Sequence, residues 1–151
     1  MIHIQNILYA TDFSPFSNQA YFHAIALAES HRASLTILYV CPAVAGAGRD
    51  AERKHWREQL EQIRPTNRDI PVRHVLLEGD SADEIVHYAL EAASDLIVMG
   101  THGRTGVQRL LMGSVAEKVV REAPCSVLVV KMAKRVPVVE PDGAAVALSP
   151  A

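Results

Sequence analysis

The chain has little of what marks several large protein classes. Its 151 residues include only two cysteines, Cys41 and Cys125, which is too few for a disulfide framework, and we expect both to be reduced. No apolar run approaches the ~18 residues that a membrane span requires. The N-terminal segment has no cationic stretch followed by an apolar one, so no signal peptide is expected. We therefore expect a cytoplasmic protein that does not bind a membrane.

Charge of one sign is also scarce. Lysine and arginine number 15 against 17 aspartates and glutamates, for a formal net charge of −2, and no basic cluster stands out. This balance argues against a nucleic-acid partner. The seven histidines form neither H-x-H nor H-E-x-x-H, so no metal site is expected.

Several phosphate-handling motifs are missing as well. There is no G-x-x-x-x-G-K-[ST], which excludes a P-loop protein, and no G-x-G-x-x-G after the first strand, which leaves dinucleotide binding unsupported. A receiver domain needs an acidic pair after the first strand, where this chain offers Asp12 alone. Pyrophosphate-forming synthetases of similar fold carry Ser-Gly-Gly there, and this chain has Thr-Asp-Phe.

What the sequence does contain is an alternation of apolar strands and amphipathic helices. Strands are predicted at 4–10, 34–40, 72–77, 96–99 and 126–131, and helices begin near 15, 50, 81 and 114. Five strands alternating with four helices predict an α/β domain, a doubly wound parallel sheet with helices on both faces and right-handed crossovers. We expect this domain to span 1–131. Residues 132–151 contain three prolines and are expected to form an extended or poorly ordered tail, with a short extended piece at 136–139.

Helix boundaries are predicted from capping residues. Ser14 precedes Pro15 and should cap the first helix. Ser81 with Glu84, and Ser114 with Glu117, have the spacing of capping boxes. The first helix should turn one face toward the sheet, made of Ala20, Ala24, Leu27, Ala28 and His31.

Glycines follow the fourth strand at a notable spacing. Gly100 and Gly103 come directly after it, and Gly113 with Ser114 opens the next helix. Glycine lets a backbone approach a ligand closely, and the first turn of a helix offers free N–H groups. Together they predict a phosphate site. The Ser114 hydroxyl could serve the helix, the ligand or both, and Arg104 and Arg109 are either surface residues or phosphate partners.

In these motifs the chain resembles the universal stress proteins. Their nucleotide-binding members carry Gly, two residues, Gly, nine residues, then Gly and Ser or Thr, matched here by Gly100, Gly103, Gly113 and Ser114. The resemblance extends from Tyr-Ala-Thr-Asp-Phe-Ser at 9–14 to Ser-Val-Leu-Val-Val-Lys at 126–131. It implies strand order 3-2-1-4-5, with a ligand between strands one and four, where the strand order reverses.

A cofactor site follows from the motifs and the resemblance together. The residues expected to bind an adenine nucleotide are Ala10, Thr11, Asp12, Val40, Met99, Gly100, Gly103, Gly113, Ser114 and Val115. Asp12 would accept hydrogen bonds from ribose or hold a metal through water, and by resemblance the Val40 backbone would face the adenine edge. ATP is the favoured ligand, with ADP, AMP and cyclic AMP open, and Mg²⁺ would be held through the phosphates.

The resemblance implies a protein that binds an adenine nucleotide as a sensing or regulatory module of a stress response. No nucleophile–base pair is visible, so no catalytic residue is assigned and an enzyme would be at most a slow ATPase or phosphoryl-transfer enzyme. The other alternative is a protein-interaction subunit without nucleotide. The predicted fifth strand is an apolar edge, which indicates a homodimer through that strand. The protein partner and the signal are not identified by the sequence.

Overall fold

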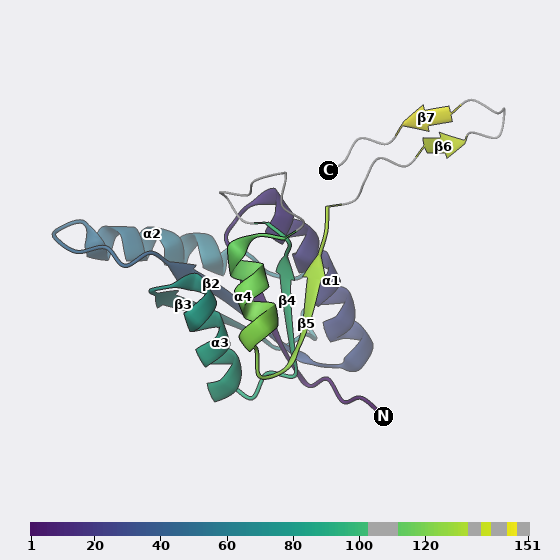
Figure 1. Ribbon diagram of the computed structural model, residues 1–151, viewed down its shortest axis with the longest axis horizontal. Helices are drawn as coiled ribbons and strands as arrows, with labels where there is room; N and C mark the ends of the chain where they lie inside the picture. Colours follow the sequence, from purple (N-terminus) through teal and green to yellow (C-terminus); the bar gives the residue numbers. More distant parts are fainter. Residues whose placement is uncertain (103–111, 133–136, 140–144, 148–151) are drawn as a thin grey trace.

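A five-stranded parallel sheet forms the centre of the protein in the computed structural model, which describes residues 1–102, 112–132, 137–139 and 145–147 (Figure 1). Its strands are β1 (Asn6–Thr11), β2 (Ser34–Cys41), β3 (Val72–Glu78), β4 (Leu96–Gly100) and β5 (Ser126–Val130). They are ordered β3-β2-β1-β4-β5, which confirms the predicted fold and strand order.

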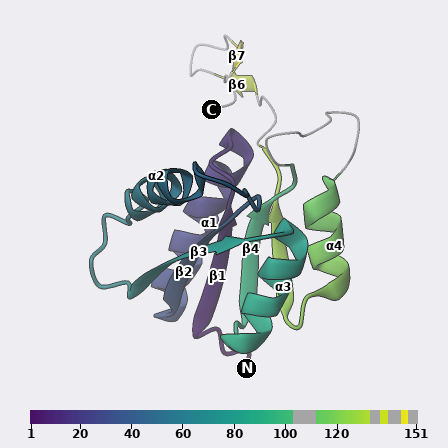
Figure 2. The same cartoon turned by 90° about the vertical axis from the view of Figure 1, so that its left-hand side faces the viewer.

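Helices cover the sheet on both faces. Figure 2 shows α1 (Pro15–His31) and α2 (Arg49–Glu61) on one side, and α3 (Ser81–Glu91) and α4 (Ser114–Glu122) on the other. Because α1 follows β1 and α4 follows β4, the crossovers from these neighbouring strands leave toward opposite faces. A crevice is therefore expected where the two strands end.

The core consists of two apolar layers, one on each face of the sheet. Along β1, Ile7 and Tyr9 pack with the α1 and α2 layer, whereas Leu8 and Ala10 pack with the α3 and α4 layer. Burial on both faces explains why the strands read as continuous apolar runs rather than as alternating ones. Cys41 and Cys125 form no disulfide, and burial raises the pKa of both thiols.

The first helix lies close to the sheet because its inner face is made of small residues. Ala20, Ala24 and Ala28 are buried there, as predicted. The prediction for His31 was wrong, since its side chain is exposed and its Nδ1 lies 3.1 Å from the Leu27 carbonyl oxygen. His31 belongs to the last turn, and a polar ring there bonds to a terminal carbonyl rather than entering the core.

The start of α3 also differs from the prediction. Asp80, not Ser81, is the N-cap, and its carboxylate accepts a hydrogen bond from the Asp83 N–H at 3.0 Å. Ser81 is already the first helical residue. Aspartate caps as well as serine does, so the cap formed one residue earlier than the capping-box spacing suggested.

The C-terminal segment contributes a separate small sheet. β6 (Pro137–Val139) lies within the segment predicted to be extended, and it pairs antiparallel with β7 (Ala145–Ala147), which was not predicted. The pair stands apart from the five-stranded sheet in Figure 1. In the described part of the chain, no helix combines the length and the apolar character needed to cross a membrane.

Candidate functional site

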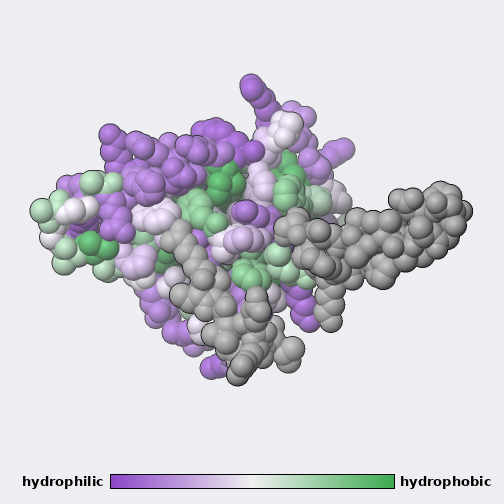
Figure 3. Space-filling model, turned by 90° about the horizontal axis from the view of Figure 1, so that it is seen from above, coloured by the Kyte–Doolittle hydropathy of each residue, from purple (hydrophilic) through white to green (hydrophobic). Residues whose placement is uncertain are grey.

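A pocket of about 600 Å³ opens at the edge where β1 and β4 end. Figure 3 looks down on the molecule from above and shows hydrophobic surface between hydrophilic residues. The pocket lining includes nine of the ten residues predicted from the sequence: Ala10, Thr11, Asp12, Val40, Met99, Gly100, Gly113, Ser114 and Val115. The tenth, Gly103, lies outside the described residues, as do Arg104 and Arg109. Residues from four separate segments thus meet at one place.

The first turn of α4 faces the pocket without a capping side chain. Gly113 is the N-cap, and as a glycine it has no side chain that could cap the helix. The first helical bond runs from the Glu117 N–H to the Gly113 carbonyl at 3.0 Å. The capping box predicted at Ser114 was wrong, because Ser114 is the first helical residue and its hydroxyl cannot take the N-cap position. Because Gly113 supplies no capping group, a ligand can take that role at the N–H groups of the first turn.

The backbone conformation at position 113 does not require a glycine. Gly113 has φ −70° and ψ 163°, an extended conformation that any residue adopts. At an N-cap, Ser, Asp or Asn would stabilise the helix more than glycine does. A glycine here adds no side chain beside the N–H groups of the first turn, which suits an anion site.

The pocket is also lined by the start of α3, through Ser81, but this helix is a poor anion site. Asp80 already occupies its N-terminus, and Asp83 and Glu84 add negative charge to the first turn. On α4, Lys118 reaches across to Asp83, with Nζ 2.7 Å from the carboxylate. The first turn of α4 also carries an acidic residue, Glu117, but its N-cap is a glycine and not a carboxylate, so of these two helix starts the one at α4 is better suited to a phosphate.

Gly100 has a packing reason to be glycine. A Cβ atom there would lie 2.8 Å from the carbonyl oxygen of Phe16 and 2.9 Å from its carbonyl carbon, so the first turn of α1 closes over the end of β4. The sequence interpretation assigned this glycine to the ligand. The structure explains the residue type by packing within the chain, although the Gly100 backbone does line the pocket.

Buried hydroxyl groups lie near the carboxyl ends of β1 and β4. The buried polar residues among those described are Thr11, Ser14, Ser17 and Thr101. Ser14 caps α1 as predicted, with its Oγ accepting from the Ser17 N–H at 3.3 Å. The Thr11 and Ser17 hydroxyl oxygens lie 3.2 Å apart, and this network fixes the loop that carries Asp12.

Asp12 lies in that loop at the pocket. One carboxylate oxygen accepts from the Ser14 N–H at 2.9 Å, which sets the orientation of the side chain. The next residue, Phe13, has φ 64° and packs its ring on Tyr39 at 4.8 Å between centroids. A non-glycine residue in this region costs about 1–3 kcal/mol, so the surrounding contacts hold the loop in a set shape.

Val40 lies past the end of β1. The last pair of the β1–β2 ladder is Thr11 with Tyr39, while β2 continues to Cys41 beside β3. The Cys41 carbonyl accepts from the Gly79 N–H on the β3 side. Neighbouring residues of a parallel strand point their polar groups to opposite sides, so the Val40 carbonyl points to the β1 side, where β1 has ended.

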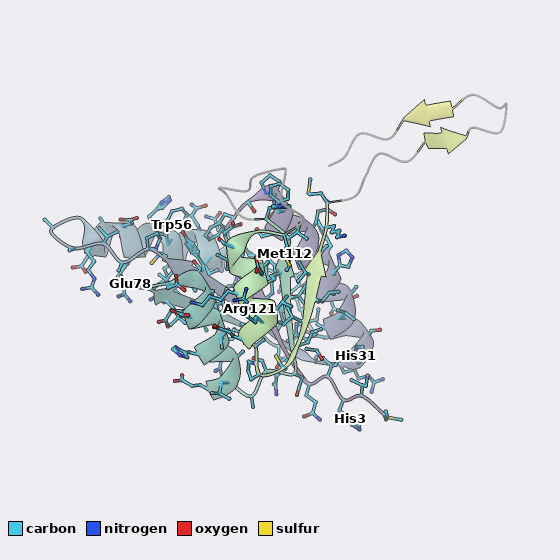
Figure 4. The ribbon with its side chains drawn as sticks, in the orientation of Figure 1. His3, His31, Trp56, Glu78, Met112 and Arg121 are labelled. Carbon is cyan, nitrogen blue, oxygen red and sulfur yellow. The ribbon has the colours of Figure 1, made fainter. Side chains whose placement is uncertain are left out.

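The sequence interpretation missed one wall of the pocket, which comes from α2. Trp56 and Glu52 line it together with Tyr39, whose ring centroid lies 4.9 Å from that of Trp56. Figure 4 shows Trp56 on α2 and Met112 before α4 at opposite sides of the upper end of the sheet. The spacing of Trp56, Leu60 and Ile63 along the sequence indicates the apolar stripe of a helix, so the sequence alone assigns Trp56 to the core. The sequence did place α2 directly after β2, and the carboxyl end of β2 lies at the same end of the sheet as Gly100 and Gly113.

Other lining residues were not predicted either: Ser17, Leu38, Pro42, Ser81, Ile85, Thr101, His102 and Ala116. Among the described residues, no group of three His, Cys, Asp or Glu side chains could hold a metal ion. The acidic side chains at the pocket are Asp12 and Glu52, on different elements.

Comparison with known proteins agrees with the fold and the motifs. The family model described as the universal stress protein family matches residues 3–131. A universal stress protein of Methanocaldococcus jannaschii is 36% identical over 143 residues, covering 87% of this chain and 84% of that protein.

Solved structures show the same architecture. The universal stress protein UspA of Lactobacillus plantarum aligns with a TM-score of 0.72 at 29% identity, over 85% of this chain and 98% of that one. A universal stress protein of Archaeoglobus fulgidus in complex with dAMP aligns with a TM-score of 0.61 at 22% identity, over 85% of this chain and 98% of that one. With its sheet order, its glycine spacing and a family match over most of its length, this chain belongs to the universal stress protein family.

Proposed function

We propose that the chain binds an adenine nucleotide, with ATP as the favoured ligand, and that it acts as a sensing or regulatory module. The observation that carries the proposal is the start of α4, where the N-cap Gly113 has an unstrained backbone and no capping side chain, and where the first-turn residues line the pocket. The volume of about 600 Å³ lies within the range of small-molecule sites.

The binding mode follows from where the polar groups lie. Phosphates would accept hydrogen bonds from the N–H groups at the start of α4. Ribose hydroxyls would donate to Asp12, whose side chain is oriented by the Ser14 N–H. The base would lie toward the end of β2, where the Val40 carbonyl can accept from the adenine amine. Mg²⁺ would be held through the phosphates, with Asp12 in reach of its water shell.

The Archaeoglobus fulgidus relative solved with dAMP supports the ligand class, because dAMP is an adenine nucleotide. At 22% identity that likeness establishes the fold alone. The argument for this chain therefore rests on its own pocket.

We test the proposal by titrating ATP into protein freed of bound nucleotide and by identifying any nucleotide that the purified protein releases on denaturation. One adenine nucleotide per chain is expected, and Asp12→Ala should weaken binding without abolishing it, because the backbone donors remain. Absence of binding by ATP, ADP and AMP would overturn the proposal and favour the interaction-subunit alternative.

Catalysis, if present, should be slow. The pocket offers Asp12 as a base, but no lysine in the described lining is placed to stabilise the transferring phosphoryl group. We expect ATP turnover far below the ~10 s⁻¹ that is typical of enzymes. Steady-state turnover near that rate, abolished by Asp12→Asn, would show an enzyme instead.

We also propose that two copies associate through β5. This strand is an edge of the sheet, paired with β4 on one side. The Thr101 N–H donates to the Val130 carbonyl at 3.1 Å, so Val130 faces β4, and the polar groups of Val129 point to the open edge. Pairing with a second β5 about a two-fold axis would satisfy them.

A further inference from the structure

The α2 wall of the pocket carries a charged side chain that the binding mode above does not use. Glu52 is half-buried and lines the pocket. Its Oε1 lies 3.5 Å from the Trp56 Nε1, at the limit of a hydrogen bond. Arg49 and Arg53, on the same helix, bind Glu78 instead, at 2.9 and 3.3 Å. A carboxylate in a pocket for a polyanion needs another reason to be there.

The position of this carboxylate is fixed by the packing of α2. The Trp56 ring, one turn after Glu52, stacks on Phe13 at 5.3 Å and contacts Tyr39 at 4.9 Å between centroids. The two ion pairs to Glu78 attach the start of the helix to the end of β3, and Figure 4 shows Trp56 and Glu78 at this end of the molecule. Glu52 lines the same pocket as Tyr39 and Val40 of β2.

Adenine presents two N–H groups on its amine at C6, and a carbonyl oxygen accepts one of them. We propose that Glu52 accepts the second, so that the Val40 carbonyl and the Glu52 carboxylate together select a base with an amino group at that position. This inference rests on the proposed nucleotide function. Hypoxanthine carries a carbonyl at C6, which would face the two acceptors, and its N1–H could donate to only one of them, so at least one acceptor would lack a partner, a costly arrangement in a partly buried site.

The test compares ATP with ITP, which differ at the C6 edge of the base. GTP is unsuitable, because its amine at C2 could donate to the same carboxylate. Removing a negative charge from the pocket should strengthen the binding of both triphosphates alike, so the ratio of their dissociation constants is the readout. Glu52→Gln keeps the size of the side chain and gives it an N–H₂ group that can turn toward a C6 carbonyl.

We expect the wild-type protein to prefer ATP in isothermal titration, and Glu52→Gln to lower that preference by about tenfold, as for the loss of one hydrogen bond to a charged group. Glu61→Gln removes the same charge from an exposed position at the end of α2 and should keep the wild-type ratio.

The two proposals fail in different ways. If the wild-type protein binds neither ATP nor ITP, the nucleotide function is wrong. If it binds ATP, and Glu52→Gln leaves the ratio of ATP to ITP within about twofold of the wild-type value, nucleotide binding stands and the role of Glu52 is wrong. A ratio that shifts equally in Glu61→Gln also contradicts the inference, because the effect would then come from charge at a distance.

Discussion

A methyl group added at Gly100 would lie 2.8 Å from the Phe16 carbonyl oxygen, closer than real Cβ contacts come. Both partners are backbone of a strand and a helix, so neither can move alone. We expect Gly100→Ala to lower the free energy of unfolding by about 1–3 kcal/mol, as overpacking does. Gly48→Ala is the matched control, because a Cβ there meets nothing within 4 Å. Urea unfolding measures both, and equal stability of the two variants would contradict the packing explanation.

We expect Tyr9 to make the stability of the fold depend on pH in the alkaline range. Its hydroxyl donates to the Ser17 carbonyl at 2.7 Å, and burial raises the pKa of Tyr9 to about 12 from 10.0. Between these values the unfolded chain releases the phenol proton before the folded chain does, so stability falls as pH rises through this window.

Tyr9→Phe should therefore be less stable at pH 8, by about 1 kcal/mol for the lost hydrogen bond. Above pH 10, the ordinary pKa of tyrosine, its stability should fall less steeply than that of the wild-type protein. Urea unfolding at a series of pH values separates the two curves. If the curves of the two proteins run parallel above pH 10, Tyr9 is not the group responsible.

Among the elements, β5 is the strand through which we propose that two copies associate. Val129→Pro removes an N–H that points to the open edge and keeps the ladder to β4, because Val130 supplies the bonds on that side. We expect a dimer for the wild-type protein by light scattering at micromolar concentration, and a monomer for Val129→Pro. Val129→Thr keeps the N–H and should remain a dimer. A wild-type monomer would contradict the proposed contact.

The order and number of the elements around the five-stranded sheet could be predicted because the apolar pattern of a sheet buried on both faces is strong in this sequence. Helix starts were predicted less well. At α3 the cap moved to Asp80, and at α4 it moved to Gly113, because capping depends on backbone angles that side-chain spacing does not specify. The same limit concealed the reason for Gly100, which lies in the approach of α1.

In the whole molecule, segments that are far apart in the sequence meet at the pocket. The sequence predicted those segments that carry glycines or a single polar residue. It missed the α2 wall, because a tryptophan at helical spacing is read as core, and Trp56 does pack on Phe13 and Tyr39. Trp56 also lines the pocket, and this depends on where α2 lies relative to the end of β2. Tertiary packing determines that position, and the helical spacing of the sequence does not.

We propose above all that the start of α4 binds the phosphates of a nucleotide. Thermal unfolding of wild type and Gly113→Val, each with and without ATP, tests it most directly. Valine can adopt the backbone angles of Gly113, so the variant should fold, and we expect its branched side chain to obstruct a phosphate at the first-turn N–H groups. At a hundredfold excess of ATP over Kd, the wild-type protein should gain about 2.7 kcal/mol. For a domain of this size, that is a rise of roughly 5–10 °C in Tm. We expect this rise for the wild-type protein and its loss in Gly113→Val. An equal rise in both proteins, or no rise in either, would contradict the proposal.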